Sequence, residues 1–272
     1  MNIQARLKSV TNISKITASM KMIASTKTTR AQRAMETARI YGLSSNEFLK
    51  QTGVAEPEAP RELLIAASSD KGLCGGIHSS ISRFCRKYIN EHPETSLVVI
   101  GDKVKAQLQR TFSDKIRTNF NQIGSRIPTF EESSAIASTI LKDTSLEFDT
   151  AKIVYNKFIS VIAYEAVTIT APGSAEQIAN SPNFNSYEVD AEILENLNEF
   201  IFGNQIHWAL VEGHASEMAA KRTAMENATK NSEEMIQKLT LSYNRGRQAV
   251  ITNELRRLTW LLPSLIHPLR RA

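Results

Sequence analysis

Apolar residues recur every three or four positions along the amino-terminal part of the chain. They are Ile3, Leu7, Val10, Ile13, Ile16, Met20 and Ile23. This spacing places one apolar stripe on a helix, and so narrow a stripe is typical of a coiled coil. The pattern predicts a helix from Ile3 to about Arg39, roughly 60 Å long at 1.5 Å per residue. A helix of that length needs a partner helix or another chain along much of its surface.

A second long helical pattern starts near Asp190. Its apolar positions follow the same steps at Leu194, Leu197, Ile201, Trp208, Val211, Ala215 and Met218, and again at Ile236, Leu239 and Tyr243. It predicts a helix of about 70 residues, roughly 100 Å long, which Pro263 ends or kinks. Two such helices at opposite ends of the chain predict an antiparallel two-stranded coiled coil. The carboxy-terminal helix is expected to project beyond its partner, and polar seam positions such as Asn204 to fix the register.

The middle of the chain alternates short apolar runs with amphipathic segments. The pattern predicts strands at Glu62–Ser68, Ser96–Gly101, Lys152–Val161 and Tyr164–Ala171, and helices at Ile77–Asn90, Val104–Arg110 and Glu131–Lys142. Gln51–Arg61 is predicted as a linker and Pro172–Tyr187 as a loop. This order is typical of an α/β domain with a partly parallel sheet that ends in a hairpin. We therefore expect an amino-terminal coiled-coil helix (1–55), a central α/β domain (56–189) and a carboxy-terminal helix with a tail (190–272).

Composition and charge narrow the class of protein. The chain has 272 residues, 42% hydrophobic and 22% charged, with a net charge of +5. No apolar run reaches the roughly 18 residues of a membrane span, which predicts a soluble chain without a direct membrane span. The basic flanks of the first helix also fit a mitochondrial transit peptide, but the stripe continues past Met20. They lack the interleaved aromatic residues of a nucleic-acid groove, so no nucleic-acid partner is predicted.

The candidate sites for chemistry are few. Two cysteines, Cys74 and Cys85, are too few for a disulfide framework and suggest a reducing compartment. We interpret them as partly buried structural thiols in preference to a redox pair. The turn Ser69–Gly76 (SDKGLCGG) lies between a strand and a helix, which suits phosphate binding, yet it matches neither a dinucleotide fingerprint nor a P-loop. We interpret it as a structural turn. His207 and His214 lie two helical turns apart, too far to bind one metal ion. No catalytic, metal or cofactor site is predicted.

Four stretches resemble one known family. They are Arg6–Ala34 (RLKSVTNISKITASMKMIASTKTTRAQRA), Ser68–Ile77 (SSDKGLCGGI), Glu217–Ala228 (EMAAKRTAMENA) and Tyr243–Leu255 (YNRGRQAVITNEL). In this order and spacing the chain resembles the gamma subunit of F-type ATP synthase, most closely the mitochondrial form. The resemblance covers nearly the whole chain up to Leu255.

The resemblance implies a rotary shaft. The terminal helices would form an antiparallel coiled coil inside an alpha3beta3 hexamer, above a Rossmann-like α/β foot. The foot would meet the small delta and epsilon subunits and the membrane c-ring, on the matrix side of the mitochondrial inner membrane. Rotation of the c-ring would reach the catalytic beta subunits through the shaft. The resemblance thus implies a non-catalytic subunit without cofactors.

The resemblance also implies site residues. Met20, Lys21 and Lys27 match the segment that faces the beta subunits, and Arg247, Gln248, Thr252 and Glu254 match the segment that contacts the upper catalytic loops. The turn residues Asp70, Gly72, Cys74, Gly75 and Gly76 match the foot's first strand-to-helix junction. Arg256–Ala272 departs from the family pattern, through an altered reading frame or exon boundary after Leu255 or through a lineage-specific tip.

Two rival functions belong to other classes of protein. A basic coiled-coil scaffold for nucleic acid would bind DNA or RNA with steep salt dependence. A nucleotide-binding α/β enzyme would use the turn Gly72–Gly76 and would bind a nucleotide as an isolated chain.

Overall fold

The computed structural model describes residues 3–54, 61–123, 126–184, 187 and 191–266 of the chain. The chain forms two compact units. One consists of Met22–Ala224, and the other of Met1–Lys21 together with Met225–Ala272. Among the described helices, none has a stretch both long and apolar enough to cross a membrane.

The two predicted long helices are present as α1 (Ile3–Thr52) and α6 (Ala191–Ile266), of 50 and 76 residues. The predicted end of the first helix near Arg39 is wrong, because α1 continues through Gly42 to Thr52. A Cβ atom on Gly42 would lie 2.4 Å from the Trp208 ring, so close packing requires glycine there. Tertiary packing thus outweighs the cost of about 1 kcal/mol that glycine carries in a helix.

Two further predictions at helix ends need correction. The predicted linker begins too early, because Gln51 and Thr52 belong to α1; its residues 55–60 lie outside the described residues. The helix α6 does not end at Pro263 but continues to Ile266. Proline disfavours a helix interior because it removes one hydrogen bond and crowds the preceding turn, but only three residues of α6 follow Pro263. A kink at Pro263 stays a prediction.

The predicted α/β sheet with a terminal hairpin is confirmed. Five strands lie in the order β3-β2-β1-β4-β5, where β4 and β5 pair antiparallel and the other pairs are parallel. Their bounds are β1 Glu62–Ala67, β2 Ser96–Ile100, β3 Ile116–Phe120, β4 Thr150–Ser160 and β5 Ala163–Pro172. This order is that of the Rossmann-like α/β folds. Sequence patterns did not indicate the edge strand β3.

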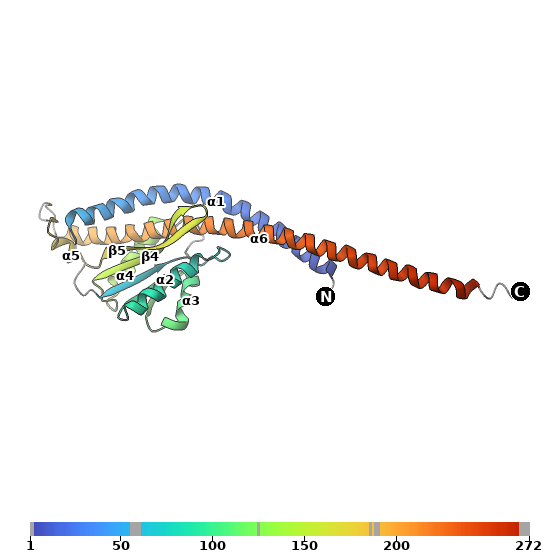
Figure 1. Ribbon diagram of the computed structural model, residues 1–272. Helices are drawn as coiled ribbons and strands as arrows, with labels where there is room; N and C mark the ends of the chain where they lie inside the picture. Colours follow the sequence, from blue (N-terminus) through green and yellow to red (C-terminus); the bar gives the residue numbers. More distant parts are fainter. Residues whose placement is uncertain (1–2, 55–60, 124–125, 185–186, 188–190, 267–272) are drawn as a thin grey trace. The chain divides into compact units, whose positions relative to one another are not determined.

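Helices cover both faces of this sheet (Figure 1). On one face, α2 (Ile77–Glu91) and α3 (Asp102–Phe112) bury Ile81, Cys85 and Leu108 against the strands. On the other face, α4 (Phe130–Lys142) and α6 bury Ile136, Phe202 and further apolar side chains. A short helix, α5 (Ala175–Ala179), lies in the segment predicted as loop. The sheet thus anchors the first part of α6 in its core.

Within the unit Met22–Ala224, α1 packs antiparallel on α6. Ala31, Met35 and Ala38 form a buried cluster with Val211, Ala215 and Met218. Nearer the end of α1, Asn204 donates to the Tyr41 carbonyl oxygen (2.9 Å) and to Ser45 Oγ (2.6 Å). The amide nitrogen of the polar seam position Asn204 therefore links the two helices through both contacts.

The buried stripe of α1 differs from the predicted one. Five buried positions follow one another at intervals of seven residues, at Val10, Thr17, Ala24, Ala31 and Ala38. This is the heptad spacing of a coiled coil, built mainly from small side chains. The larger residues Ile13, Ile16 and Ile23 are 49%, 54% and 58% exposed. Small side chains at these positions let the helices approach closely, while Ile13, Ile16 and Ile23 lie outside the contact.

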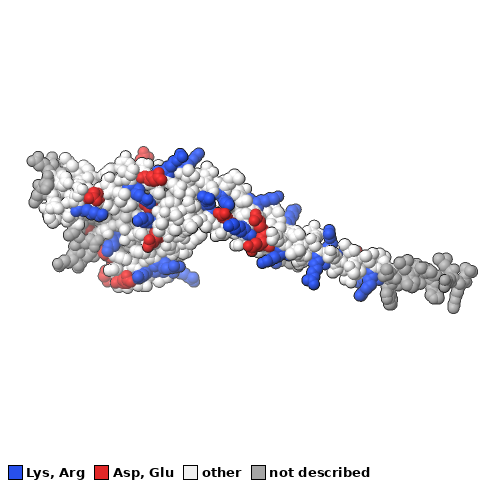
Figure 2. Space-filling view, turned by 45° about the horizontal axis from the view of Figure 1, so that its top comes forward, with Lys and Arg blue, Asp and Glu red and all other residues white. Residues whose placement is uncertain are grey.

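The unit formed by Met1–Lys21 and Met225–Ala272 is helical in its described part. Thr229 Oγ1 donates to Thr17 Oγ1 over 2.8 Å, and Lys21 Nζ lies 3.2 Å from Glu226 Oε1. From Arg245 to Leu258 the side chains of α6 are exposed. Figure 2 shows basic side chains along this stretch. The helix α6 therefore offers a long surface to other chains.

Candidate functional site

The predicted interface residues lie on the surfaces of the two long helices. Met20 is half-buried, Lys21 pairs with Glu226, and Lys27 is exposed. The later group, Arg247, Gln248, Thr252 and Glu254, is exposed along α6. Exposed large apolar side chains accompany both groups: Ile13, Ile16, Met22 and Ile23 on α1, and Leu241, Val250, Ile251, Leu255 and Leu258 on α6. Exposed apolar side chains and charged side chains thus occur together on each of the two long helices.

The predicted turn Asp70–Gly76 is held by backbone contacts of Asp70. Its carboxylate accepts from the backbone N–H of Asp102 (2.7 Å) and of Ile123 (3.1 Å). The first contact caps the amino end of α3, where an acidic group is favoured. Leu73 and Gly75 have φ angles of 63° and 64°, a conformation that glycine adopts easily. Gly72 and Gly76 are exposed. The carboxylate of Asp70 thereby ties the turn to the start of α3 and to the loop at Ile123.

Cys74 belongs to a hydrogen-bonded group that sequence patterns did not indicate. His78 Nε2 lies 3.1 Å from Cys74 Sγ and 2.8 Å from the Lys71 carbonyl oxygen, and His78 Nδ1 lies 2.7 Å from Ser68 Oγ. Burial raises the pKa of the Cys74 thiol to about 11 and lowers the pKa of His78. A protonated, buried thiol is a poor nucleophile. The contacts of His78 with Cys74, Lys71 and Ser68 therefore hold the turn against the start of α2.

Both cysteines are buried free thiols, as predicted. Cys85 lies in the core on the α2 face of the sheet, where burial raises its pKa to about 12. His207 and His214 lie in different surroundings: His207 Nδ1 is 3.3 Å from Ser133 Oγ, whereas His214 lines a small cavity beside Glu217. Among the residues that the structure describes, no group of three or more His, Cys, Asp or Glu side chains is placed to hold a metal ion.

A buried polar arrangement in the larger unit, which we call the Glu212 junction, joins α1, α6 and β4. Its side chains and backbone belong to Glu212, Arg39, Trp208 and Phe158. The fully buried Glu212 carboxylate accepts from Arg39 Nη2 (2.6 Å), Trp208 Nε1 (2.5 Å) and the Phe158 backbone N–H (3.2 Å). A buried carboxylate is tolerated only with such partners. No local pattern indicates this junction, because Arg39 and Glu212 are 173 positions apart.

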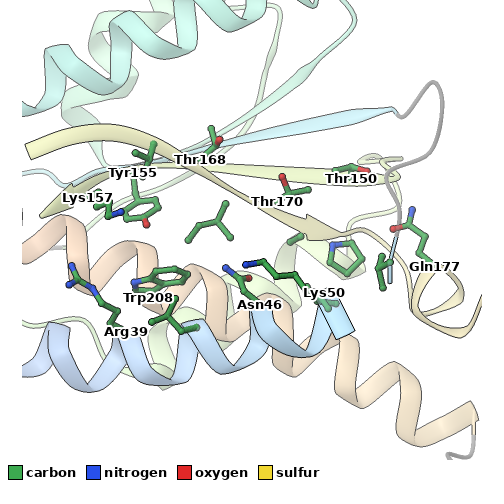
Figure 3. Close-up of a pocket in the computed structure, with 17 residues that line it drawn as sticks. Arg39, Asn46, Lys50, Thr150, Tyr155, Lys157, Thr168, Thr170, Gln177 and Trp208 are labelled. Carbon is green, nitrogen blue, oxygen red and sulfur yellow. The ribbon is translucent and has the colours of Figure 1, made fainter. Parts of the chain in front are cut away.

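An open pocket of about 630 Å³ lies beside the Glu212 junction. Figure 3 shows Arg39, Lys157, Tyr155 and Trp208 around one part of it, and Lys50 and Gln177 around another. The described residues that line it include three basic side chains and no acidic one. Burial raises the pKa of Tyr155 above its ordinary value, which keeps the phenol neutral. The lining therefore offers apolar contacts and positive charge.

Most of the chain is similar to known proteins of one family. Residues 1–258 match the model of a protein family described as ATP synthase. The mitochondrial ATP synthase subunit gamma of Yarrowia lipolytica is 44% identical over 259 residues, which cover 93% of this chain and 87% of the relative. The mitochondrial ATP synthase F(1) complex subunit gamma of Rattus norvegicus is 42% identical over 261 residues, covering 93% and 94%.

A solved structure is similar as well. A chain from the central stalk and c-ring of the Tetrahymena thermophila mitochondrial ATP synthase superposes with a TM-score of 0.69 at 27% identity. The superposition covers 78% of this chain and 99% of that chain. Sequence and structure therefore agree that this chain belongs to the family of mitochondrial ATP synthase gamma subunits.

Proposed function

We propose that this chain is the central-stalk rotor subunit of a mitochondrial ATP synthase and carries rotation of the c-ring to the catalytic beta subunits. The single observation that carries the proposal is the row of exposed large apolar side chains on α1 and α6. Apolar surface of this kind on an elongated helix marks contact with other chains. A close-fitting hexamer around the helices would cover it.

The partners follow from this role. The coiled coil would occupy an alpha3beta3 hexamer, and the α/β foot (56–189) would meet the delta and epsilon subunits and the c-ring. The similar Tetrahymena chain belongs to a central stalk with its c-ring. The chain would then be a peripheral protein on the matrix side of the inner membrane. The catalytic residues would belong to the beta subunits.

The architecture suits the transmission of torque. The sheet and α4 bury α6 between Phe202 and Leu210, so a turning foot carries this helix with it. The Glu212 junction then links α6 to α1 and to β4. Packed helices resist slipping because buried side chains interlock in one register. Rotation applied at the foot would therefore reach both helices.

A bead attached to the foot tests this role directly. Lys87 has a 79% exposed side chain, and both native cysteines are buried, so a Lys87→Cys variant offers one reactive thiol. In a complex with alpha and beta subunits fixed to a surface, we expect ATP to drive the bead in one rotational direction. A bead that shows only undirected motion while the complex hydrolyses ATP would contradict a rotor.

A substitution in the Lys21–Glu226 pair can distinguish a contact with partner subunits from an effect on the stability of the chain. Lys21 and Glu226 are 39% and 36% exposed, so Lys21→Ala is expected to change the free energy of unfolding by no more than about 1 kcal/mol. We expect ATP hydrolysis by the assembled complex to change several-fold, because Lys21 would face acidic segments of the beta subunits. Lys230→Ala is the matched control, since Lys230 lies 3.9 Å from the same Glu226 carboxylate. Equal effects of the two variants on hydrolysis would argue against a contact at Lys21.

The exposed group on α6 gives a second test of the interface. Arg247, Gln248, Thr252 and Glu254 are exposed, so alanine substitutions there are expected to leave the unfolding free energy within about 0.5 kcal/mol. We expect Arg247→Ala and Gln248→Ala to slow ATP hydrolysis by the assembled complex, measured with excess ATP. Exposed Arg245, two residues before Arg247, supplies a control in Arg245→Ala. Unchanged hydrolysis in the Arg247 and Gln248 variants would remove these residues from the interface.

A further inference from the structure

A cavity of about 20 Å³ lies where α6 faces the end of β1 and the start of α2. Its walls come from Ser68 and Ser69 at the end of β1, from Asn156 on β4, and from His214 and Glu217 on α6. A cavity of about 10–15 Å³ in this measure is large enough for one water molecule. The cavity thus has the size of a single internal water site.

Three buried polar atoms in these walls have no hydrogen-bond partner among the described residues. They are Glu217 Oε1, His214 Nδ1 and Asn156 Oδ1, on side chains from residues that are 2%, 7% and 2% exposed. Polar atoms buried without a partner are rare and costly. Three of them around one polar cavity indicate a shared ligand.

The orientation of two of these groups is fixed by their other atoms. Ser69 Oγ donates to Glu217 Oε2 over 2.6 Å, which leaves Oε1 as the second carboxyl oxygen. Asn156 Nδ2 donates to the Ile77 carbonyl oxygen over 3.1 Å, so the amide oxygen is the atom left over. The residues that line the cavity therefore leave a carboxyl oxygen, an amide oxygen and an imidazole nitrogen without a partner.

We propose that this cavity binds one internal water molecule that bridges Glu217, His214 and Asn156, and that Glu217 holds a proton there as part of the attachment of α6 to the β1–α2 turn. The number of available hydrogen-bond donors indicates that Glu217 holds a proton. A water molecule donates two hydrogen bonds, whereas an ionised Glu217, an Asn156 oxygen and a bare His214 nitrogen would require three. With a proton on Glu217 Oε1, the carboxyl donates to the water, and the water donates to His214 and Asn156. Every polar atom in the cavity then has a partner.

Burial of the Glu217 carboxyl favours this arrangement, and it outweighs Lys221 and Lys71, which favour the ionised form. Burial raises the pKa of the Glu217 carboxyl to about 7 despite the Ser69 hydrogen bond, and burial lowers the pKa of His214 to about 4. Charged and titratable groups face the site from every neighbouring element: Asp70, Lys71 and Cys74 from the turn, His78 from α2, Lys103 from α3, Lys221 from α6, and Lys27 from α1 beside His214. A neutral His214 accepts from water, and a neutral Glu217 donates to it.

One rival arrangement satisfies the same atoms. If His214 carries its proton on Nδ1, the imidazole donates to the water, and an ionised Glu217 accepts from it. The two arrangements differ in their dependence on pH. A protonated Glu217 makes the native state bind a proton more tightly than the unfolded chain, so raising the pH through neutrality removes stability. The rival gives Glu217 no such effect.

Unfolding of the full chain in urea at pH 6 and pH 8 distinguishes the two arrangements. Tryptophan fluorescence follows the transition for the unchanged chain and for Glu217→Gln, whose amide donates as a protonated carboxyl does. Both chains contain His214, His78 and every other titratable group. The contributions of these groups to the pH dependence of unfolding therefore cancel when the two chains are compared. From a pKa of about 7 against an ordinary 4.5, the unfolding constant of the unchanged chain should rise about tenfold more over this interval than that of Glu217→Gln.

The control is Glu233→Gln, because Glu233 is exposed on α6; it should follow the unchanged chain. An identical pH dependence in the unchanged chain and Glu217→Gln would overturn the proposal. Should Glu217→Gln fail to fold, infrared spectroscopy of the unchanged chain reads the proton directly. We expect a buried carboxylic-acid band that disappears between pH 6 and pH 8, and its absence at pH 6 would overturn the proposal.

The water is tested separately by an experimental structure of the full chain in its complex at pH 6. Density for one molecule within hydrogen-bonding distance of Glu217, His214 and Asn156 is the expected result. A collapsed or empty cavity would overturn the bridging role.

Discussion

Replacing Glu212 by alanine is expected to lower the free energy of unfolding of the full chain by about 3–5 kcal/mol. The carboxylate is fully buried and accepts from Arg39, Trp208 and the Phe158 backbone. Its removal leaves the indole N–H and the backbone N–H buried without a partner and opens a cavity between α1, α6 and β4. Unfolding in urea, extrapolated to water, measures the loss.

Two comparisons make this prediction specific. Glu212→Gln keeps the shape and one acceptor oxygen, so it should cost less than Glu212→Ala. The exposed Glu233→Ala on the same helix should stay within about 0.5 kcal/mol of the unchanged chain. A loss below about 1 kcal/mol for Glu212→Ala would mean that the junction does not hold the two helices to the sheet.

Replacing Gly42 by alanine should destabilise the chain although alanine is the better helix former. A Cβ atom at this position would lie 2.4 Å from Trp208 ring atoms, and Trp208 is buried. The two helices must separate or the indole must turn, at a cost of about 1–3 kcal/mol, or more if the Glu212 junction is disturbed. The gain in helix propensity is about 1 kcal/mol. We expect a net loss in the unfolding free energy.

Gly246→Ala is the matched control for Gly42→Ala. Gly246 also lies inside a long helix, and a Cβ atom there meets nothing within 4 Å. Alanine should therefore stabilise the chain by about 0.5–1 kcal/mol. Stabilisation by both substitutions would show that α1 and α6 do not pack closely at Gly42.

Hydrophobic spacing predicted the long helices and the buried strands well. Runs such as Leu63–Ala67 are apolar throughout, as central parallel strands require. The edge strand β3, Ile116–Phe120, has only two large apolar residues and no fully buried position, so its pattern is weak. The extension of α1 past Gly42 was not predictable from propensity, because it depends on the Trp208 ring far along the chain.

The seam of the coiled coil shows where the pattern misleads. Large apolar residues at Ile13, Ile16 and Ile23 suggested the contact stripe, but Thr17 and Ala24 are buried in their place. A hydrophobic stripe indicates a contact without saying whether the partner is within the chain or outside it. In a subunit of an assembly, the larger side chains can serve the outer contact.

The polar sites had no local signal at all. The hydrogen-bonded residues Ser69 and Glu217 are 148 positions apart in the sequence. Glu212 and Phe158, which are also hydrogen-bonded, are 54 positions apart. Such pairs arise only when the fold brings distant segments together. The interface residues, from Met20 and Lys21 to Glu254, came instead from the family resemblance, and their roles stay predictions for the complex to test.

Co-purification tests the rotor assignment most directly. The tagged chain is expressed in the cells that encode it, and the proteins bound to it are identified and quantified. We predict alpha and beta subunits in equal amounts, both in excess of this chain as a surrounding hexamer requires, together with ATP hydrolysis. Recovery of the chain alone, or with nucleic acid in place of these subunits, would contradict the account.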